Sequence, residues 1–169
     1  MIARAIEGVV GVLVAPECAA CGGVLEAPCE GPVCAACWRA VHPVAAPFCG
    51  ICGDPLRSWR VLTVADGLCA RCRRVPPSFS VARSAGSYEG ALRDIIHAFK
   101  YDARRTLAAP LAALMRDRAA DLLRDADLVV PVPLHVWRRL RRGFNQAEDL
   151  AKRLGVPMCR ALRRTRATL

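Results

Sequence analysis

The sequence predicts an α/β protein whose first part is a small cysteine-rich module. Cysteine, glycine and proline dominate residues 16–77, which show no long helical period. After Pro76-Pro77 the pattern alternates between segments typical of strands and of helices. Hydrophobic residues make up 54% of the 169 residues, which excludes a disordered polyelectrolyte and predicts a packed core. We therefore expect a helix over 1–17, a cysteine-rich module over 18–75 and an α/β body over 76–169.

The first residues predict a short amphipathic helix. Apolar residues recur there at helical spacing, at Ile2, Ile6, Val9, Val10 and Leu13. The longest apolar stretch, residues 8–16, is shorter than the ~20 residues that a membrane-crossing helix needs. A signal peptide is not indicated, because Glu7 interrupts the basic start and no small-x-small cleavage site follows. We expect a cytoplasmic protein without a membrane partner.

Eight of the ten cysteines form four Cys-x-x-Cys units, which predict two metal sites. The units are Cys18 with Cys21, Cys34 with Cys37, Cys49 with Cys52, and Cys69 with Cys72. Both sulfurs of one such turn can reach the same ion, and two turns complete a tetrahedral zinc shell. We group consecutive units into two structural zinc sites, with an iron–sulfur cluster or disulfides as the alternatives. Closed shells leave no position for substrate, so the zinc ions are expected to stabilise rather than catalyse.

Two further features belong to the same module. Gly22 and Gly53 follow the first unit of each pair, where glycine lets the backbone fold back after the second ligand. Cys29 and Cys159 are left without a partner unit, and we expect them to be small buried apolar residues.

The elements of the body follow from its hydrophobic pattern. Residues 81–88 are expected to form a strand and residues 89–99 a helix with one apolar face. A second helix is expected over 106–123, and a buried strand over 127–133 that prolines terminate. A basic loop follows, and a last helix begins at Asn145, which can cap it together with Glu148. Such alternation favours a parallel sheet with covering helices.

Positive charge is concentrated at the carboxyl end. From Trp137 to Leu169 there are ten basic residues and two acidic ones, a net charge of +8 within the chain's total of +10. Because ligands bind beyond the carboxyl ends of strands in open parallel sheets, the loop after residue 133 is a candidate phosphate site. Its candidate residues are Arg138, Arg139, Arg141, Arg142, Gly143 and Asn145, joined by Lys100 at the end of the preceding helix. The alternative is a solvated arginine-rich face in a chain that has 23 arginines and two lysines.

The sequence resembles the ComF family of competence-associated proteins. The resemblance rests on the Cys-x-x-Cys array, on Tyr88-Glu-Gly90 with Phe99-Lys-Tyr101, and above all on Val130-Pro-Val-Pro-Leu134 followed by Arg142-Gly-Phe-Asn-Gln-Ala147. It implies a double zinc ribbon followed by a type I phosphoribosyltransferase-like, Rossmann-like domain. The arginines would then contact the pyrophosphate of a phosphoribosyl pyrophosphate-like ligand, with Mg²⁺ bridging that pyrophosphate in the complete domain.

The chain departs from the family pattern in one respect. It contains no pair of adjacent aspartates and no Thr-Thr-Gly-like loop, which the family's transferase relatives use to hold the ribose and its 5′-phosphate. We therefore expect a partial, C-terminally truncated domain, a fragment that does not catalyse phosphoribosyl transfer by itself and for which we assign no catalytic residues. The competing hypothesis is a binding module for single-stranded DNA, or for competence-machinery proteins in DNA uptake, that uses the basic carboxyl-terminal segment.

Overall fold

A computed structural model describes residues 16–56 and 67–166 of the chain. The predicted helix over 1–17 lies almost entirely outside these residues. The described chain divides into two compact units, of which one joins the residues up to Val41 with those from Tyr88 onward, and the other spans His42–Ser87. The two cysteine-rich halves therefore belong to different units. The expected boundaries at residues 75 and 76 stay a prediction.

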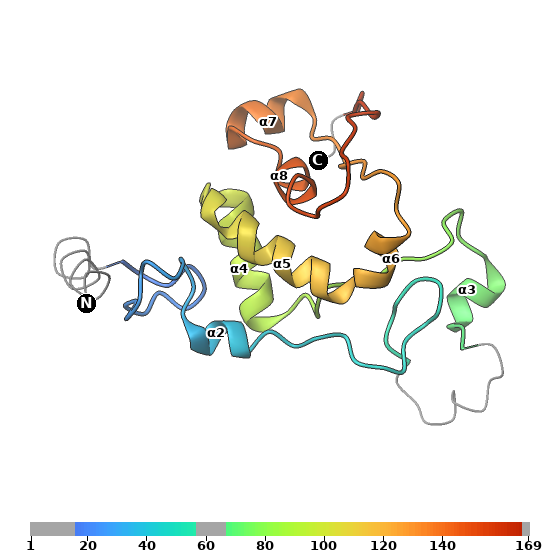
Figure 1. The fold of residues 1–169 in the computed structure, drawn as a ribbon, viewed down its shortest axis with the longest axis horizontal. Helices are drawn as coiled ribbons and strands as arrows, with labels where there is room; N and C mark the ends of the chain where they lie inside the picture. The colour runs from blue at the N-terminus through green and yellow to red at the C-terminus, as the bar shows by residue number, and fades with distance from the viewer. Residues whose placement is uncertain (1–15, 57–66, 167–169) are drawn as a thin grey trace. The chain divides into compact units, whose positions relative to one another are not determined.

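The first unit is helical, with elements numbered as in Figure 1. Its elements are α2 (Ala35–Arg39), α4 (Gly90–Tyr101), η2 (Arg105–Leu107), α5 (Ala108–Arg118), α6 (Ala120–Arg124), α7 (Val136–Arg142) and α8 (Gln146–Ala151). Helix α5 packs against α8, α6 and η2, and α4 packs against η2 and α2. The first cysteine-rich half, which contains α2, is thus attached to the helices of the body.

The core of this unit lies on the buried side of α4. Leu92, Ile95 and Phe99 face inward there, as the apolar pattern of the sequence predicts. The centroids of the Phe99 and Phe144 rings lie 5.7 Å apart, in the tilted arrangement that aromatic pairs prefer. The same apolar cluster includes Cys18, Leu25 and Val33, with Cys34, Cys37 and Trp38 packed at its edge. One hydrophobic core therefore joins the first cysteine-rich half to the helical body.

The helix predicted over 106–123 forms in three parts. The 3-10 turn η2 precedes α5, and α5 ends at Arg118. Its C-cap residue Ala119, with φ of −119° and ψ of 23°, separates it from α6. Pro110 lies in the first turn of α5, where its missing N–H has no helical partner to lose. The predicted helical character is confirmed, and the break at Ala119 is a correction.

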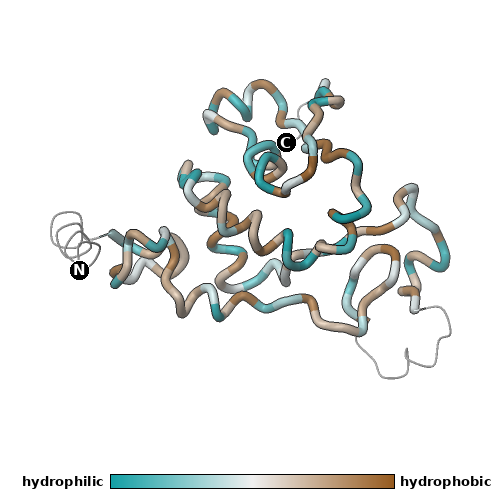
Figure 2. Tube along the Cα trace, in the orientation of Figure 1, coloured by the Kyte–Doolittle hydropathy of each residue, from teal (hydrophilic) through white to brown (hydrophobic). Residues whose placement is uncertain are grey.

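The two predicted strands do not form in the described residues, so the α/β architecture is not confirmed. Within 127–133 only Val129 pairs, in a single parallel bridge with Met158, and Pro131 and Pro133 have no N–H to extend a ladder. Figure 2 shows this hydrophobic stretch as an extended segment after α6. Residues 81–87 instead belong to the second unit, where Ala82 N–H donates to Ile51 O and Ser87 N–H to His42 O.

The residues predicted as a basic loop form helix α7. Gly143 ends it with a left-handed φ of 74°, and its N–H donates to Arg139 O at 2.8 Å. The helix that follows is capped as predicted, because the Asn145 side chain accepts a hydrogen bond from Ala147 N at 3.1 Å. Glu148 does not complete that cap and instead pairs with Arg160 and Lys152.

No helix within residues 16–56 and 67–166 is both long enough and apolar enough to cross a membrane.

Candidate metal centres and the surrounding basic surface

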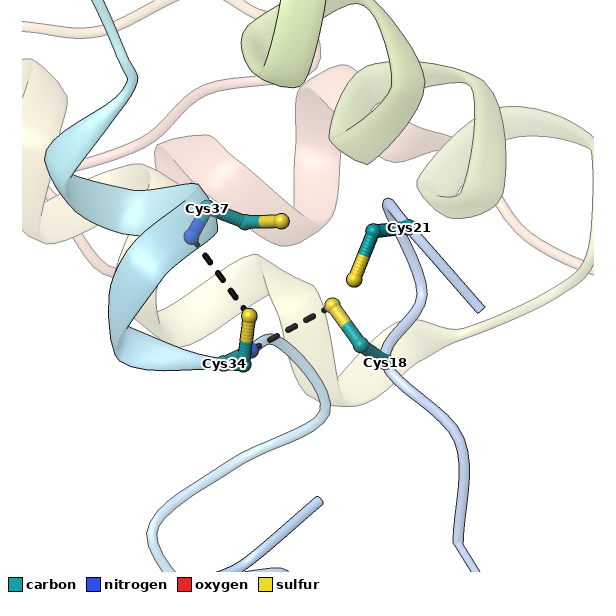
Figure 3. A group of neighbouring side chains, drawn as sticks. All are labelled: Cys18, Cys21, Cys34 and Cys37. Atoms are coloured by element: carbon teal, nitrogen blue, oxygen red, sulfur yellow. Dashed lines mark hydrogen bonds between the residues drawn. The ribbon is translucent and has the colours of Figure 1, made fainter. Parts of the chain in front are cut away.

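The structure gathers the eight predicted ligands into two clusters, grouped as the sequence predicts. One cluster holds Cys18, Cys21, Cys34 and Cys37, and the other holds Cys49, Cys52, Cys69 and Cys72. Within each cluster all four sulfurs lie within 4.8 Å of one another. Figure 3 shows the first cluster, whose sulfurs face a common centre from one turn of the chain and from the start of α2.

Both clusters are built on one backbone plan. In the first, Cys18 N–H donates to Gly23 O at 2.7 Å and Gly22 N–H to Cys18 O at 2.9 Å. In the second, Cys49 N–H donates to Asp54 O at 2.8 Å and Gly53 N–H to Cys49 O at 2.9 Å. Gly22 and Gly53 both take left-handed conformations, with φ of 71° and 72°. The predicted glycine turn is confirmed in both halves.

In each zinc site the second Cys-x-x-Cys motif lies at the start of a short helix. This explains why no glycine follows that motif. Cys34 is the N-cap of α2, and its sulfur accepts a hydrogen bond from Cys37 N at 3.5 Å. Cys69 is the N-cap of α3 (Ala70–Arg74), and its sulfur accepts from Cys72 N at the same distance. A helical turn places both sulfurs on one side without a left-handed residue.

The electrostatics of each cluster favour a cation. Burial raises the pKa of Cys18, but backbone hydrogen bonds from Cys34, Cys21 and Ala20 outweigh it and bring that pKa down to about 6. The Cys49 thiol has a pKa of about 6 for the corresponding reasons. Burial and the neighbouring thiols raise the pKa of Cys72 to about 12, and they raise that of Cys37 as well. One thiolate therefore forms readily in each cluster, and a positive ion among the sulfurs would favour deprotonation of Cys37 and Cys72.

The donor set fits tetrahedral zinc. A Zn–S distance of about 2.3 Å implies sulfurs about 3.8 Å apart at the corners of a tetrahedron. The Cys52 and Cys69 sulfurs lie 3.7 Å apart. The ten cysteines form no disulfide. Four soft sulfur donors per site complete a tetrahedral shell, which is typical of a structural zinc centre, so the metal would hold each half together without activating water.

Cys29 and Cys159 are exposed, which corrects the expectation that they are buried. Neither belongs to a cluster of potential metal ligands in the part of the chain that the structure describes.

Three predicted phosphate-binding residues lie around Gln146, at the start of α8. The Gln146 amide donates to Lys100 O at 3.2 Å and accepts from Arg142 Nη1 at 3.3 Å. Asn145, next to it, donates through Nδ2 to Val132 O at 3.3 Å. The structure thus connects the end of α4, the end of α7 and the extended segment at Val132. The sequence pattern did not predict that Gln146 is buried at this junction.

Two exposed tyrosines on this surface lie beside cations. Lys100 Nζ lies 5.9 Å from the centre of the Tyr88 ring, and the Arg142 guanidinium lies 4.8 Å from that of Tyr101. Each tyrosine is 56% exposed, and the Tyr101 ring also lies 5.1 Å from the His97 ring. Arg139 and Arg141 on α7 are also exposed, beside Trp137, which is 74% exposed. Two cation–tyrosine pairs therefore accompany the junction at Gln146.

A second, ionic group of contacts also holds α8 in place. Asp149 is buried and receives two hydrogen bonds from Arg105, at 3.0 and 3.3 Å. Glu148 is buried beside it, and hydrogen bonds from Arg160 and Lys152 hold its pKa below the usual value. The Arg105 guanidinium also lies 5.0 Å from the centre of the Phe144 ring. These acids have a structural role that the sequence pattern did not indicate.

Comparison with known proteins assigns the family. The model of the double zinc ribbon domain matches residues 9–73, which include all eight clustered cysteines. The chain is 31% identical over 153 residues to the DNA utilization protein YhgH of Escherichia coli K12, covering 78% of this chain and 67% of that protein. The chain belongs to the ComF family.

Other relatives of this ComF-family chain extend the comparison. It is 31% identical over 143 residues to competence protein F of Haemophilus influenzae, covering 82% of this chain and 58% of that protein. A YhgH protein of Salmonella typhimurium is 31% identical over 134 residues. The chain therefore spans about three fifths to two thirds of the length of these relatives. No solved structure gives a significant match.

Proposed function

We propose that this ComF-family chain is a zinc-stabilised module that binds single-stranded DNA in competence-related DNA handling. The two Cys₄ sites stabilise the fold, and the contact surface is the one formed by Tyr88, Lys100, Tyr101, Arg142 and α7. The main support is the pairing of each exposed tyrosine with a cation, at 5.9 and 4.8 Å. The names of the relatives, a competence protein and DNA utilization proteins, agree with this chemistry.

The proposed chemistry divides between rings and cations. An aromatic face that is open on one side can stack on any base, and such stacking is sequence-tolerant. Arginine and lysine beside the ring neutralise phosphates and release counterions. Paired bases of a duplex are already stacked on one another, so this surface favours a single strand over a duplex.

Fluorescence anisotropy with a labelled 20-nucleotide thymidine oligomer and a duplex of the same length tests the proposal. We expect tighter binding to the single strand and an affinity that falls steeply as salt rises from 50 to 200 mM. Y88A combined with Y101A should weaken single-strand binding at least tenfold, because each stacked base contributes about 1–3 kcal/mol. Replacing both tyrosines by phenylalanine should preserve most of the affinity.

A charge-matched control distinguishes binding at the proposed surface from general electrostatic attraction between a basic protein and DNA. R139E with R141E removes positive charge from α7, whereas R93E with R118E makes the same change at exposed positions of α4 and α5. We expect the first pair to weaken binding far more than the second. Equal losses for the two pairs, or equal affinity for single strand and duplex, would contradict the proposal.

A second candidate ligand is a phosphoribosyl pyrophosphate-like molecule. It is favoured by the convergence of Lys100, Arg142 and Asn145 around Gln146. Isothermal titration with phosphoribosyl pyrophosphate in a buffer containing Mg²⁺ tests it. Binding that K100A and R142A each weaken supports this candidate, and absence of binding heat for the unmodified chain rules it out for these residues.

A further inference from the structure

The two zinc sites share one backbone plan, but only the second has a pair of oppositely charged side chains at two corresponding positions. In the second site these are Asp54 and Arg71. The corresponding residues of the first site are Gly23, whose carbonyl accepts the same bond from the first ligand's N–H, and Ala36. Ala36 corresponds to Arg71 because its carbonyl accepts from Ala40 N–H, as that of Arg71 does from Val75 N–H. The first site, shown in Figure 3, therefore has neither an acid nor a cation at these positions.

The pair connects the two halves of the second site. Asp54 lies just beyond the turn that holds Cys49 and Cys52, and Arg71 lies between Cys69 and Cys72 at the start of α3. Arg71 Nη2 donates to Asp54 Oδ2 at 3.1 Å. The Cys52 thiol and the Asp54 carboxylate both lie close enough to the Arg71 guanidinium to raise its pKa. The ion pair thus adds a side-chain link between the two halves, beside the hydrogen bond that Cys69 N–H donates to Cys49 Sγ at 3.4 Å.

The chemistry of a zinc–thiolate centre gives this contact a consequence. Four thiolates around one Zn²⁺ carry a net charge of −2, and a guanidinium beside one sulfur offsets part of it. A hydrogen-bonded thiolate attracts protons and other electrophiles less readily, and groups that orient metal ligands raise metal affinity. Because the pair is largely exposed, with side-chain exposures of 69% and 57%, its effect is expected to be moderate.

A second difference acts in the same direction. In the second site Cys49 and Cys72 are both buried, whereas in the first site Cys18 is buried and Cys21 is exposed. Water, protons and chelators reach an exposed sulfur more easily than a buried one.

We propose that Asp54 and Arg71 are positioning residues of the second zinc site, and that zinc leaves this site more slowly than the first. The two sites of the double ribbon then release zinc at unequal rates, and the metal of the first site is the more labile. This inference concerns metal binding alone and does not depend on the proposed DNA contact.

Zinc release from the full zinc-loaded chain tests the proposal. Excess chelator is added, and released zinc is followed with a colorimetric indicator while mass spectrometry of alkylated peptides identifies which cysteines become free. We expect two phases, with Cys21 and Cys34 alkylated before Cys52 and Cys69. R71A should accelerate the slow phase about three- to tenfold and leave the fast phase unchanged. D54N should also accelerate the slow phase. The double variant should release zinc only slightly faster than either single variant, because both substitutions remove the same interaction.

Arg73 provides the matched control. It is an exposed arginine of the same helix α3, so R73A removes one positive charge near the same site without breaking the contact with Asp54. We expect R73A to leave the slow phase unchanged. R71K, which keeps the charge but loses the planar fork, should fall between R71A and the unmodified chain.

Transplanting the pair provides the converse test. Gly23 has no left-handed φ, and a Cβ added there would meet Cys21 Sγ at 3.5 Å, which is ordinary contact. Ala36 is exposed, so G23D with A36R introduces the pair into the first site without a steric clash. We expect the fast phase to slow. A single release phase, earlier alkylation of the second site, or equal acceleration by R71A and R73A would overturn the proposal.

Discussion

At the scale of single residues, the two cysteine turns allow one glycine to be compared with its counterpart. Gly22 and Gly53 have nearly identical φ angles of 71° and 72°. A Cβ on Gly22 would have no atom within 4 Å, whereas a Cβ on Gly53 would lie 2.8 Å from the carbonyl oxygen of Ala82. Both positions require a left-handed backbone, but only Gly53 also requires the absence of a side chain.

We predict that G53A destabilises the protein more than G22A. Each change should cost about 1–2 kcal/mol for the left-handed conformation, and G53A should cost about 1–3 kcal/mol more because Ala82 must move. Urea unfolding of the zinc-loaded chain, followed by circular dichroism, measures both. Equal destabilisation by the two variants would show that residues 81–87 do not lie against the second turn.

The buried Glu148 gives a prediction about pH. Hydrogen bonds from Arg160 and Lys152 lower its pKa in the folded state, so it stabilises the fold fully above its unfolded pKa of about 4.3. That stabilisation is lost as the pH falls through the lower folded pKa. We expect the free energy of unfolding to exceed that of E148Q at pH 7 and the difference to shrink below about pH 4. Protonation of the zinc ligands affects both proteins alike, so the difference between them isolates Glu148. A difference that stays constant with pH would contradict this role.

At the scale of elements, success of the sequence-based predictions depended on how local the deciding interaction is. The Cys₄ groupings, the Asn145 cap and the inward face of α4 were predicted, because ligand spacing, capping and helical periodicity all act within a few residues. The two strand predictions were not confirmed, because a strand forms only when it pairs with another strand, and the local hydrophobic pattern does not contain that partner. Helix α7 was predicted as a loop on account of its arginines. Val136 and Leu140 four positions apart, with Gly143 just beyond the end, were signals that indicate a helix.

The start of α8 offers a prediction at this scale. Asn145 both caps the helix, by accepting from Ala147 N, and donates to Val132 O in the extended segment. We predict that N145A destabilises the fold by about 1 kcal/mol through loss of the cap. N145D keeps the acceptor and loses only the donor to Val132, so it should cost less. Thermal unfolding of the two variants distinguishes these contributions, and a loss for N145D as large as that for N145A would show that the link to Val132 matters more than the cap.

At the scale of the whole molecule, the two zinc sites differ in how much of the hydrophobic core packs against each of them. The first cluster shares its core with the helical body, since Cys18, Leu25 and Val33 pack in one group with Phe99 and its neighbours. The second cluster lies in the separate compact unit His42–Ser87. The repeated ligand spacing did not indicate this difference, because equivalent spacing does not show which apolar surface each half packs against.

We predict that losing the first metal unfolds far more of the protein than losing the second. C18S with C34S should reduce hydrogen-exchange protection in α4 and α5. Without zinc, the apolar side chains of the segment 16–39 are no longer held against Phe99 and Leu107. C49S with C69S removes the corresponding two ligands from the second site and should leave that protection unchanged, with one zinc per chain still bound. Hydrogen–deuterium exchange measured by mass spectrometry on both variants and on the unmodified chain resolves these peptides separately. If both variants lose protection in α4 equally, the two zinc sites belong to one cooperative unit, and the division at Val41 and Tyr88 does not describe how the protein unfolds.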